Sequence, residues 1–241
     1  MKSSNPLKWH GGKTYLAKTI IAHMPPRCKN PNNPADDDAG WLHYVEPYAG
    51  GLAVLFANDP EGISEVVNDL DIELSNFWRV LGSPELFERF RRRAAATPVS
   101  NLLFKLSKAA EAIGFTNDGT ADARSVDAAF SFFVRYRQSR QGLGKDFGTL
   151  TRNRTRRGMN EQASAWLSAV EGLPDAHERL IRVIVENGFA LKLIRQQVGP
   201  AHVVLSRPAV SPLDAGHKIR LPPRNDAATT CPSARDDRTA A

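Results

Sequence analysis

The sequence predicts an α/β fold in which strands and helices alternate along the chain. Residues 41–51 have the pattern of a strand that runs into a glycine-rich turn, and residues 52–58 begin a helix. Residues 63–71 form a second apolar strand that ends in acids, and residues 72–81 have helical spacing. This order favours a parallel sheet. The 241 residues, 41% of them hydrophobic, suffice for one α/β domain with an insertion or for two small domains.

The rest of the chain is mostly helical in pattern until its last part. Residues 15–24 are predicted to form a helix with Thr14 as its N-cap. The other predicted elements are a polar loop over residues 28–40, mostly helix over 84–140, a glycine-rich basic loop over 142–160, a short helix over 163–173, and a helix or strand, a turn and a helix over 177–197. Beyond about residue 205 the apolar periodicity disappears, and this tail is expected to be disordered.

Composition restricts the classes of partner and the compartment. The formal charge of +6 and the pI of about 9.5 suit a polyanion such as nucleic acid, with an ordinary basic surface as the alternative. Cys28 and Cys231 lie too far apart to indicate a metal site or a disulfide framework. No apolar run approaches the length of a membrane span, and the N-terminus has no hydrophobic signal core. We therefore expect a cytoplasmic protein without metal or membrane contact.

The first motif is KWHGGKT at residues 8–14. Its GKT triplet is typical of a P-loop, but Leu7 stands where that motif needs a glycine, and no strand precedes it. In another interpretation Trp9 and Lys13 flank two glycines that let the backbone approach a ligand closely. A basic N-terminal turn is the alternative.

The second motif, VEPYAGG at residues 45–51, places an acid at the end of the first strand. Glu46 can hold a cationic group or a hydroxyl, and the glycines after Tyr48 permit a ligand to approach the carboxyl edge of the sheet. The turn lacks the GxGxxG pattern of dinucleotide-binding proteins, and an ordinary strand-to-helix turn is the alternative.

The third motif, VVNDLD at residues 66–71, ends the second strand. Asp69 is placed to accept hydrogen bonds from the two ribose hydroxyls of a nucleoside. A helix N-cap is the alternative role, and Asp69 and Asp71 could divide the two roles between them.

The three motifs follow one another along the chain as KWHGGK, EPYAGG and NDLDIEL. In this order they resemble the motifs of the Dam-like adenine-N6 DNA methyltransferases, and the resemblance covers roughly residues 5–200. The resemblance implies a Rossmann-like methyltransferase sheet with a mostly helical insertion, S-adenosylmethionine as cofactor, double-stranded DNA as partner and no metal. It implies a cofactor site with Trp9, Lys13, Glu46, Tyr48 and Gly50 around the ligand and Asp69 on its ribose. It implies DNA phosphate contacts from Arg137, Arg140, Lys145, Arg152, Arg154 and Arg156, for which a solvated loop is the alternative. Tyr136 departs from the family pattern, which has an asparagine there.

The catalytic motif of this family, DPPY, occurs nowhere in the chain. In the family its Asp and a proline carbonyl accept hydrogen bonds from the N6 amine of a flipped adenine, and its Tyr stacks on the base. The motif is expected near Arg207, Pro208, Ala209 and Val210, so no catalytic residue is assigned.

A shift of the reading frame accounts for the missing motif. Permitted codons for VLSRPAVS, read one nucleotide downstream, spell FYRDPPY, and the same shift continues as LPSTRDTKSVYRHEMT. We expect a frameshift between about residues 196 and 204, an out-of-frame tail, and a sheet incomplete at its C-terminal side that lacks the strand carrying DPPY. Exposed apolar surface and marginal stability should follow.

The expected organisation has four parts: a cofactor-binding α/β part over residues 1–83, a target-recognition insertion over 84–160, a return to the α/β part over 161–204, and the tail over 205–241. The expected function is site-specific adenine-N6 methylation of DNA. A catalytically dead DNA- or cofactor-binding remnant is the main alternative, and a nucleotide hydrolase, motivated by GGKT alone, is the third. Roles in restriction-modification and in the self-protection of a phage or mobile element fit equally well.

Overall fold

The sheet has four parallel strands in the order β5-β2-β1-β6. The computed structural model describes residues 5–28, 40–113, 122–148, 155–197 and 202–205, which all lie within one compact unit. The strands are β1 His43–Glu46, β2 Ser64–Asn68, β5 Val183–Glu186 and β6 His202–Val204. In the register, Val45 of β1 pairs with Val66 of β2 and Val204 of β6. The predicted α/β class is confirmed, and the architecture is consistent with a Rossmann-like methyltransferase fold.

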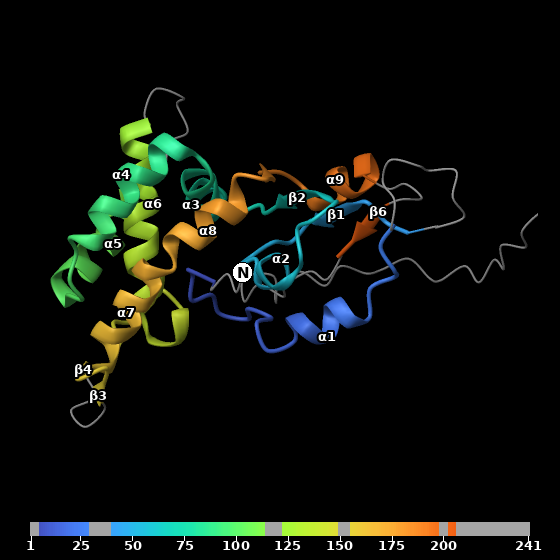
Figure 1. Ribbon diagram of the computed structural model, residues 1–241. Coiled ribbons are helices and arrows are strands. Elements are labelled where there is room, and N and C mark those ends of the chain that lie inside the picture. Colours follow the sequence, from blue (N-terminus) through green and yellow to red (C-terminus); the bar gives the residue numbers. More distant parts are fainter. Residues whose placement is uncertain (1–4, 29–39, 114–121, 149–154, 198–201, 206–241) are drawn as a thin grey trace, which may run out of the picture. The chain divides into compact units, whose positions relative to one another are not determined.

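Helices connect the strands and cover both sides of the sheet. These helices are α1 Ala17–Ala22, α2 Ala53–Ala57, α3 Ile72–Gly82 and α9 Ala190–Gln197. α1 and α2 lie on one side of the sheet and α9 on the other (Figure 1). Because parallel strands end at the same edge, this arrangement brings the turns after β1, β2 and β5 together.

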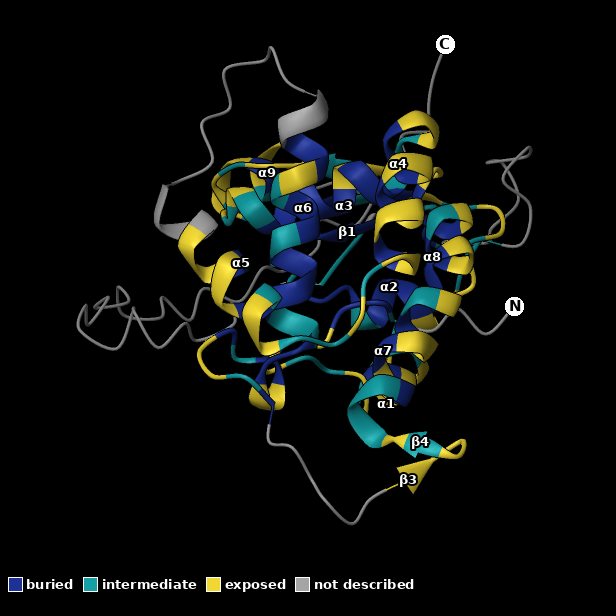
Figure 2. Cartoon of the chain, turned by 90° about the vertical axis from the view of Figure 1, so that its left-hand side faces the viewer, coloured by how far each residue is buried: buried dark blue, intermediate teal, exposed yellow. Residues whose placement is uncertain are grey.

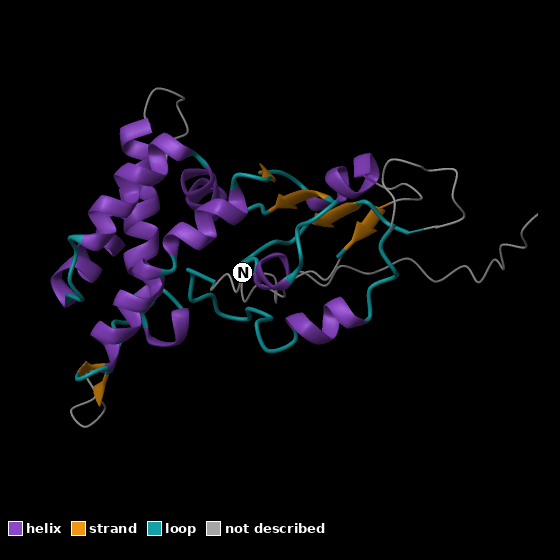
Figure 3. Ribbon diagram, viewed as in Figure 1, coloured by secondary structure: helices purple, strands orange, loops and turns teal. Residues whose placement is uncertain are grey.

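The segment between α3 and β5 is a group of helices beside the sheet (Figure 3). Its elements are α4 Pro84–Ala95, α5 Asn101–Ile113, α6 Asp122–Arg137, the 3₁₀ turn η1 Arg140–Gly142, the hairpin strands β3 Thr155–Arg156 and β4 Met159–Asn160, α7 Glu161–Glu171 and α8 Leu173–Leu180. The predicted mostly helical pattern of this segment is confirmed.

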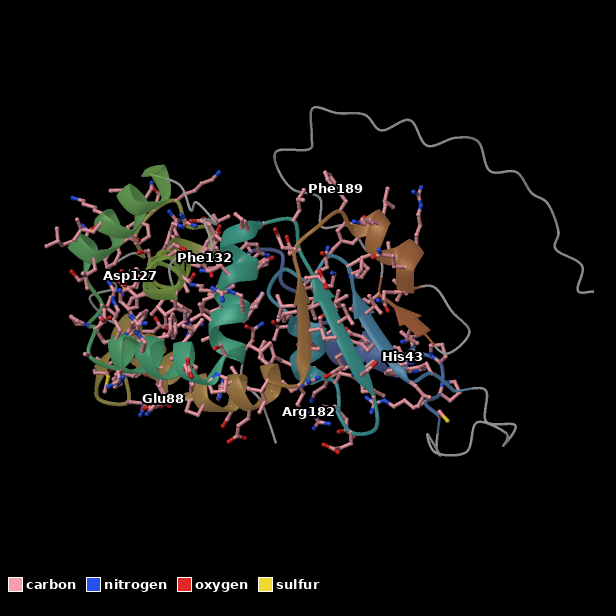
Figure 4. All side chains as sticks on the ribbon, turned by 90° about the horizontal axis from the view of Figure 1, so that it is seen from above. His43, Glu88, Asp127, Phe132, Arg182 and Phe189 are labelled. Atoms are coloured by element: carbon pink, nitrogen blue, oxygen red, sulfur yellow. The ribbon has the colours of Figure 1, made fainter. Side chains whose placement is uncertain are left out.

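Aromatic side chains join the helices to the α/β part in one hydrophobic core. Phe77 of α3 lies with its ring centroid 5.9 Å from Phe90 of α4 and 5.6 Å from Phe132 of α6. Phe132 lies deep among the side chains of the helical segment (Figure 4). α3 and α6 are accordingly mostly buried, whereas α4, α5 and α7 each present an exposed face (Figure 2). Since Tyr44 of β1 belongs to the same buried cluster, the core is continuous from the sheet into the helices.

A buried ion pair forms a second connection between these parts. Arg179 of α8 binds both carboxylate oxygens of Glu65 on β2, and its Nη2 donates to the Leu55 carbonyl of α2 at 3.1 Å. Both side chains are almost fully buried. Removal of either partner would leave a buried charge without compensation, which costs about 3–5 kcal/mol.

Two sequence predictions are wrong. Thr14 does not cap the first helix, because α1 starts at Ala17 after Leu16, which makes no side-chain cap bond. The sheet was expected to lack the strand that leads to DPPY, but β6 occupies that part of the chain and pairs with β1. Of the tail predicted to be disordered, Leu205 is described and donates its amide to the Val45 carbonyl at 2.8 Å, and residues 206–241 lie outside the described residues.

Large apolar side chains are exposed around β5 and α9. They are Ile181, Ile184, Phe189 and Leu191, each more than half exposed. Phe189 projects outward at the periphery (Figure 4). Exposed apolar side chains were expected from the sequence, and these four lie at the edge strand β5 and at the helix that follows it. Among the described helices, none is both long and apolar enough to cross a membrane.

Candidate functional site

A pocket opens at the carboxyl edge of the sheet, where the N-terminal segment meets the turn between β1 and α2. Its walls come from two stretches of chain that are far apart in sequence. The lining residues are Trp9, His10, Gly11, Gly12, Lys13, Glu46, Tyr48, Ala49, Gly50, Gly51, Ala53 and Val54. Five of the six residues predicted for the cofactor site thus line one pocket, and the sixth, Asp69, contacts its wall.

The N-terminal segment forms a tight turn that is tied to the sheet. The amide of Gly12 donates to the Trp9 carbonyl at 3.1 Å, and Gly11 has a φ of 75°, a conformation that favours glycine. The Asn5 side chain donates to the Gly51 carbonyl at 2.5 Å. These bonds hold the KWHGGK motif against the turn after β1.

Trp9 packs directly on the glycines of the second motif. A methyl group added at Gly51 would lie 2.8 Å from the Trp9 Cβ, and one at Gly50 would lie 3.1 Å from its Nε1. Gly50 also has a φ of 49°, and its carbonyl accepts a bond from the Trp78 indole at 3.1 Å. The glycines are therefore needed here for close packing and for a left-handed backbone.

Asp69 and Asp71 have separate roles at the end of β2. Asp69 accepts a hydrogen bond from the Gly50 amide through Oδ2 at 2.9 Å and one from the Asp71 amide through Oδ1 at 3.0 Å. Asp71 accepts bonds from the amides of Glu73 and Leu74 and caps α3. Burial raises the pKa of Asp69 despite these two bonds. Asp71 is thus the N-cap of α3, whereas Asp69 is bonded to the glycine turn that lines the pocket.

Glu46 is a buried acid in the pocket wall. Burial raises the pKa of its carboxyl to about 8, while the charge of Lys13 and the backbone amide of Leu55 oppose this shift. Its Oε2 is buried and has no hydrogen-bond partner among the described residues. The pocket therefore offers an unused acceptor to a ligand.

Two residues that support the site were not singled out from the sequence. The Asn68 side chain donates to the carbonyls of Pro47 and Gly188, both at 3.0 Å, and ties the turn after β1 to the turn after β5. Tyr44 lies beneath Glu46 and is fully buried. A polar group at the buried end of an apolar strand is the signal that could have identified Asn68.

The residues predicted to bind DNA fall into three groups. Arg137 donates through Nη2 to the Ala165 carbonyl of α7 at 2.8 Å, and burial lowers its pKa to about 10. Arg140, Lys145 and Arg156 are exposed. Arg152, Arg154 and the segment where DPPY is expected, Arg207 to Val210, lie outside the described residues.

The pocket and its wall combine three chemically different groups. Glu46 offers an unpaired acceptor, Trp9 a flat apolar surface and Asp69 a carboxylate beside the glycine turn. Within the described ranges no three His, Cys, Asp or Glu side chains are close enough together to hold a metal ion.

Comparison with known families gives one match. The sequence model of the D12 class N6 adenine-specific DNA methyltransferases matches residues 9–137, which is more than half of the chain. A comparison with curated proteins found no match. The matched range contains every pocket residue and extends to the end of α6. The chain therefore belongs to the D12 class N6 adenine-specific DNA methyltransferase family.

Proposed function

We propose that the chain binds S-adenosylmethionine in the pocket at the carboxyl edge of the sheet. The observation that supports this most is that Trp9, Lys13, Glu46, Tyr48 and Gly50, taken from two separate motifs, line one pocket. The bound cofactor supplies an electrophilic methyl group on a sulfonium. Within the pocket Glu46 holds a cationic group of the ligand, and Trp9 provides an apolar wall.

In this proposal Asp69 binds the ribose. One carboxylate can accept bonds from the two ribose hydroxyls while it keeps the Gly50 amide in place. Lys13 lines the same pocket as Glu46, and its positive charge favours the ionised form of that carboxyl. A nucleotide hydrolase has no comparable support, because its motif lacks the glycine at Leu7.

The insertion of residues 84–160 is proposed to bind duplex DNA, the substrate of the family. Arg140, Lys145 and Arg156 are exposed cations in or beside this segment and suit phosphate groups. Residues 1–83 and the strands and helix from β5 onward then form the cofactor-binding α/β part, while α7 and α8, which were expected in that part, lie with the helices beside the sheet.

We further propose that the in-frame relative of this chain is the active methyltransferase and that the 241-residue chain is a catalytically dead remnant. The supporting observation is that β6 leads toward the position where a one-nucleotide shift spells FYRDPPY. The chain as written lacks the Asp and the proline carbonyl of that motif, which orient the lone pair of the adenine N6 toward the methyl group.

Sequencing of the coding DNA across codons 190–215, followed by a methylation assay, tests this. The 241-residue chain and a frame-restored chain are incubated with radiolabelled S-adenosylmethionine and adenine-containing duplex DNA. We expect label in DNA only with the frame-restored chain. Adenine methylation by the 241-residue chain would refute the remnant, and a shifted frame that does not spell DPPY would refute the frameshift.

A further inference from the structure

Glu46 is enclosed at the inner wall of the pocket. It ends β1, is 4% exposed, and belongs to the pocket lining. One carboxyl oxygen, Oε2, lacks a hydrogen-bond partner in the described part of the chain. No described Lys, Arg or His forms an ion pair with Glu46. A carboxylate in this place would be a buried charge with little compensation.

The groups that face Glu46 come from each neighbouring element. Tyr44 of the same strand lies beside it, and Glu65 of β2 adds a negative charge that further disfavours ionisation. Arg179 of α8 forms its ion pair with Glu65. Lys13 of the N-terminal turn, the Tyr44 hydroxyl and the Leu55 amide of α2 favour the ionised form, but burial outweighs them and the pKa of Glu46 stays raised.

We propose that Glu46 is a neutral carboxylic acid in the ligand-free protein and gives up its proton when a cationic group of S-adenosylmethionine enters the pocket. This inference rests on the proposed cofactor site. The O–H bond of Glu46 breaks, its electron pair stays on the carboxylate, and the proton passes to solvent. The ligand keeps its charge, so a neutral acid and a cation become an ion pair plus one free proton.

The electrostatics of the site support this. The pKa of Glu46 is raised to about 8 without ligand, so the carboxyl is protonated near neutral pH. A cation within about 4–6 Å lowers a carboxyl pKa by about 1–3 units. Cofactor affinity should then rise with pH by up to about tenfold per unit until it levels off near pH 8.

Isothermal titration calorimetry at about pH 6.5 tests the inference on the 241-residue protein. S-adenosylmethionine is titrated in phosphate and in an amine buffer, and the difference in heat gives the number of protons released. At this pH the α-ammonium group of the ligand stays charged, since α-amino groups have pKa values of about 7.7–8.0. We expect release of about 0.2 to 0.9 proton per ligand, because a pKa of about 8 that falls by about 1–3 units leaves the bound carboxyl partly to almost fully ionised at this pH. Binding with no proton release would overturn the inference and leave the cofactor site standing.

S-adenosylhomocysteine, which lacks the sulfonium, identifies the cationic group. Proton release with both ligands assigns the ammonium as the partner of Glu46, and release with S-adenosylmethionine alone assigns the sulfonium. Glu46→Gln should release no proton, show no pH dependence of affinity below pH 8 and bind at least about tenfold more weakly at pH 8. Glu61→Gln, which changes an exposed glutamate outside the pocket lining, is the matched control and should behave as the wild type.

A measurement without ligand separates the two proposals. The ¹³C carboxyl resonance that disappears in Glu46→Gln is followed against pH in labelled protein. A midpoint above about pH 7 supports the neutral acid even if S-adenosylmethionine does not bind, in which case the cofactor site fails. A midpoint below about pH 6 overturns the inference whatever the ligand does.

Discussion

The indole ring of Trp9 lies against the phenol ring of Tyr136, with their centroids 4.8 Å apart. Trp9 also packs on Gly50 and Gly51 in the turn after β1. Tyr136 belongs to α6 and contacts Phe132, one turn earlier, at 4.5 Å. The helical segment thus supports the Trp9 side of the pocket from behind, and the residue that departs from the family pattern contacts Trp9.

Tyr136→Ala should weaken cofactor binding. The substitution removes the ring that supports Trp9, and aromatic pairs contribute about 0.5–1.5 kcal/mol beyond their buried area. We expect about a three- to tenfold loss of S-adenosylhomocysteine affinity in calorimetry, together with a lower midpoint of urea unfolding. Tyr136→Phe keeps the ring and should retain most of the affinity. Equal affinities for wild type and Tyr136→Ala would show that α6 does not support the pocket.

Asp69→Ala should mainly lower cofactor affinity, whereas Asp71→Ala should mainly lower the free energy of unfolding. Asp69→Ala removes the acceptor for the Gly50 amide and the proposed ribose contact, so cofactor affinity should fall by about tenfold or more. Asp71→Ala removes an N-cap and should lower the free energy of unfolding by about 0.5–2 kcal/mol with little change in affinity. Calorimetry and urea unfolding of both variants distinguish the two roles. If Asp71→Ala instead abolishes binding, the assignment of Asp69 is wrong.

The local part of the site could be predicted from the sequence, because each motif acts through its own backbone. Gly50 follows Glu46 at a strand end, and both face the pocket whatever the rest of the fold does. Partners distant in sequence could not be predicted. The bonds of Arg179 to Glu65 and the contact of Trp9 with Tyr136 depend on how helices pack on the sheet, and neither residue type indicates its partner.

The arginines predicted to bind DNA illustrate the same limit. A run of cations predicts phosphate contacts only where the side chains are exposed. Arg137 belongs to that run, yet its guanidinium is bound to the Ala165 carbonyl and its pKa is lowered by burial. The bond of a particular arginine to a backbone carbonyl follows from the contact of α6 with α7, which no local pattern in the sequence describes.

Arg137→Ala and Arg156→Ala should therefore differ in stability. Arg137→Ala removes the bond to the Ala165 carbonyl and should destabilise the protein by about 0.5–1.5 kcal/mol. Arg156 is exposed on β3, and Arg156→Ala should change stability by less than about 0.5 kcal/mol. For Arg156→Ala we expect weaker duplex binding with a salt slope reduced by about 1. Unfolding curves and fluorescence anisotropy at several salt concentrations check both variants, and an unchanged salt slope would remove Arg156 from the DNA surface.

Glu46 should also make stability depend on pH. Its pKa is about 8 in the folded protein and near 4.5 when exposed, so the folded state binds more protons between these values. The contribution is fully present below about pH 4.5 and is lost as pH rises toward 8, with a slope of up to about 1.4 kcal/mol per pH unit. Glu46→Gln cannot ionise and should become more stable than the wild type as pH rises through this window. Urea unfolding of both proteins at several pH values measures the difference, and a difference that does not change with pH would mean that Glu46 is ionised in the folded protein throughout.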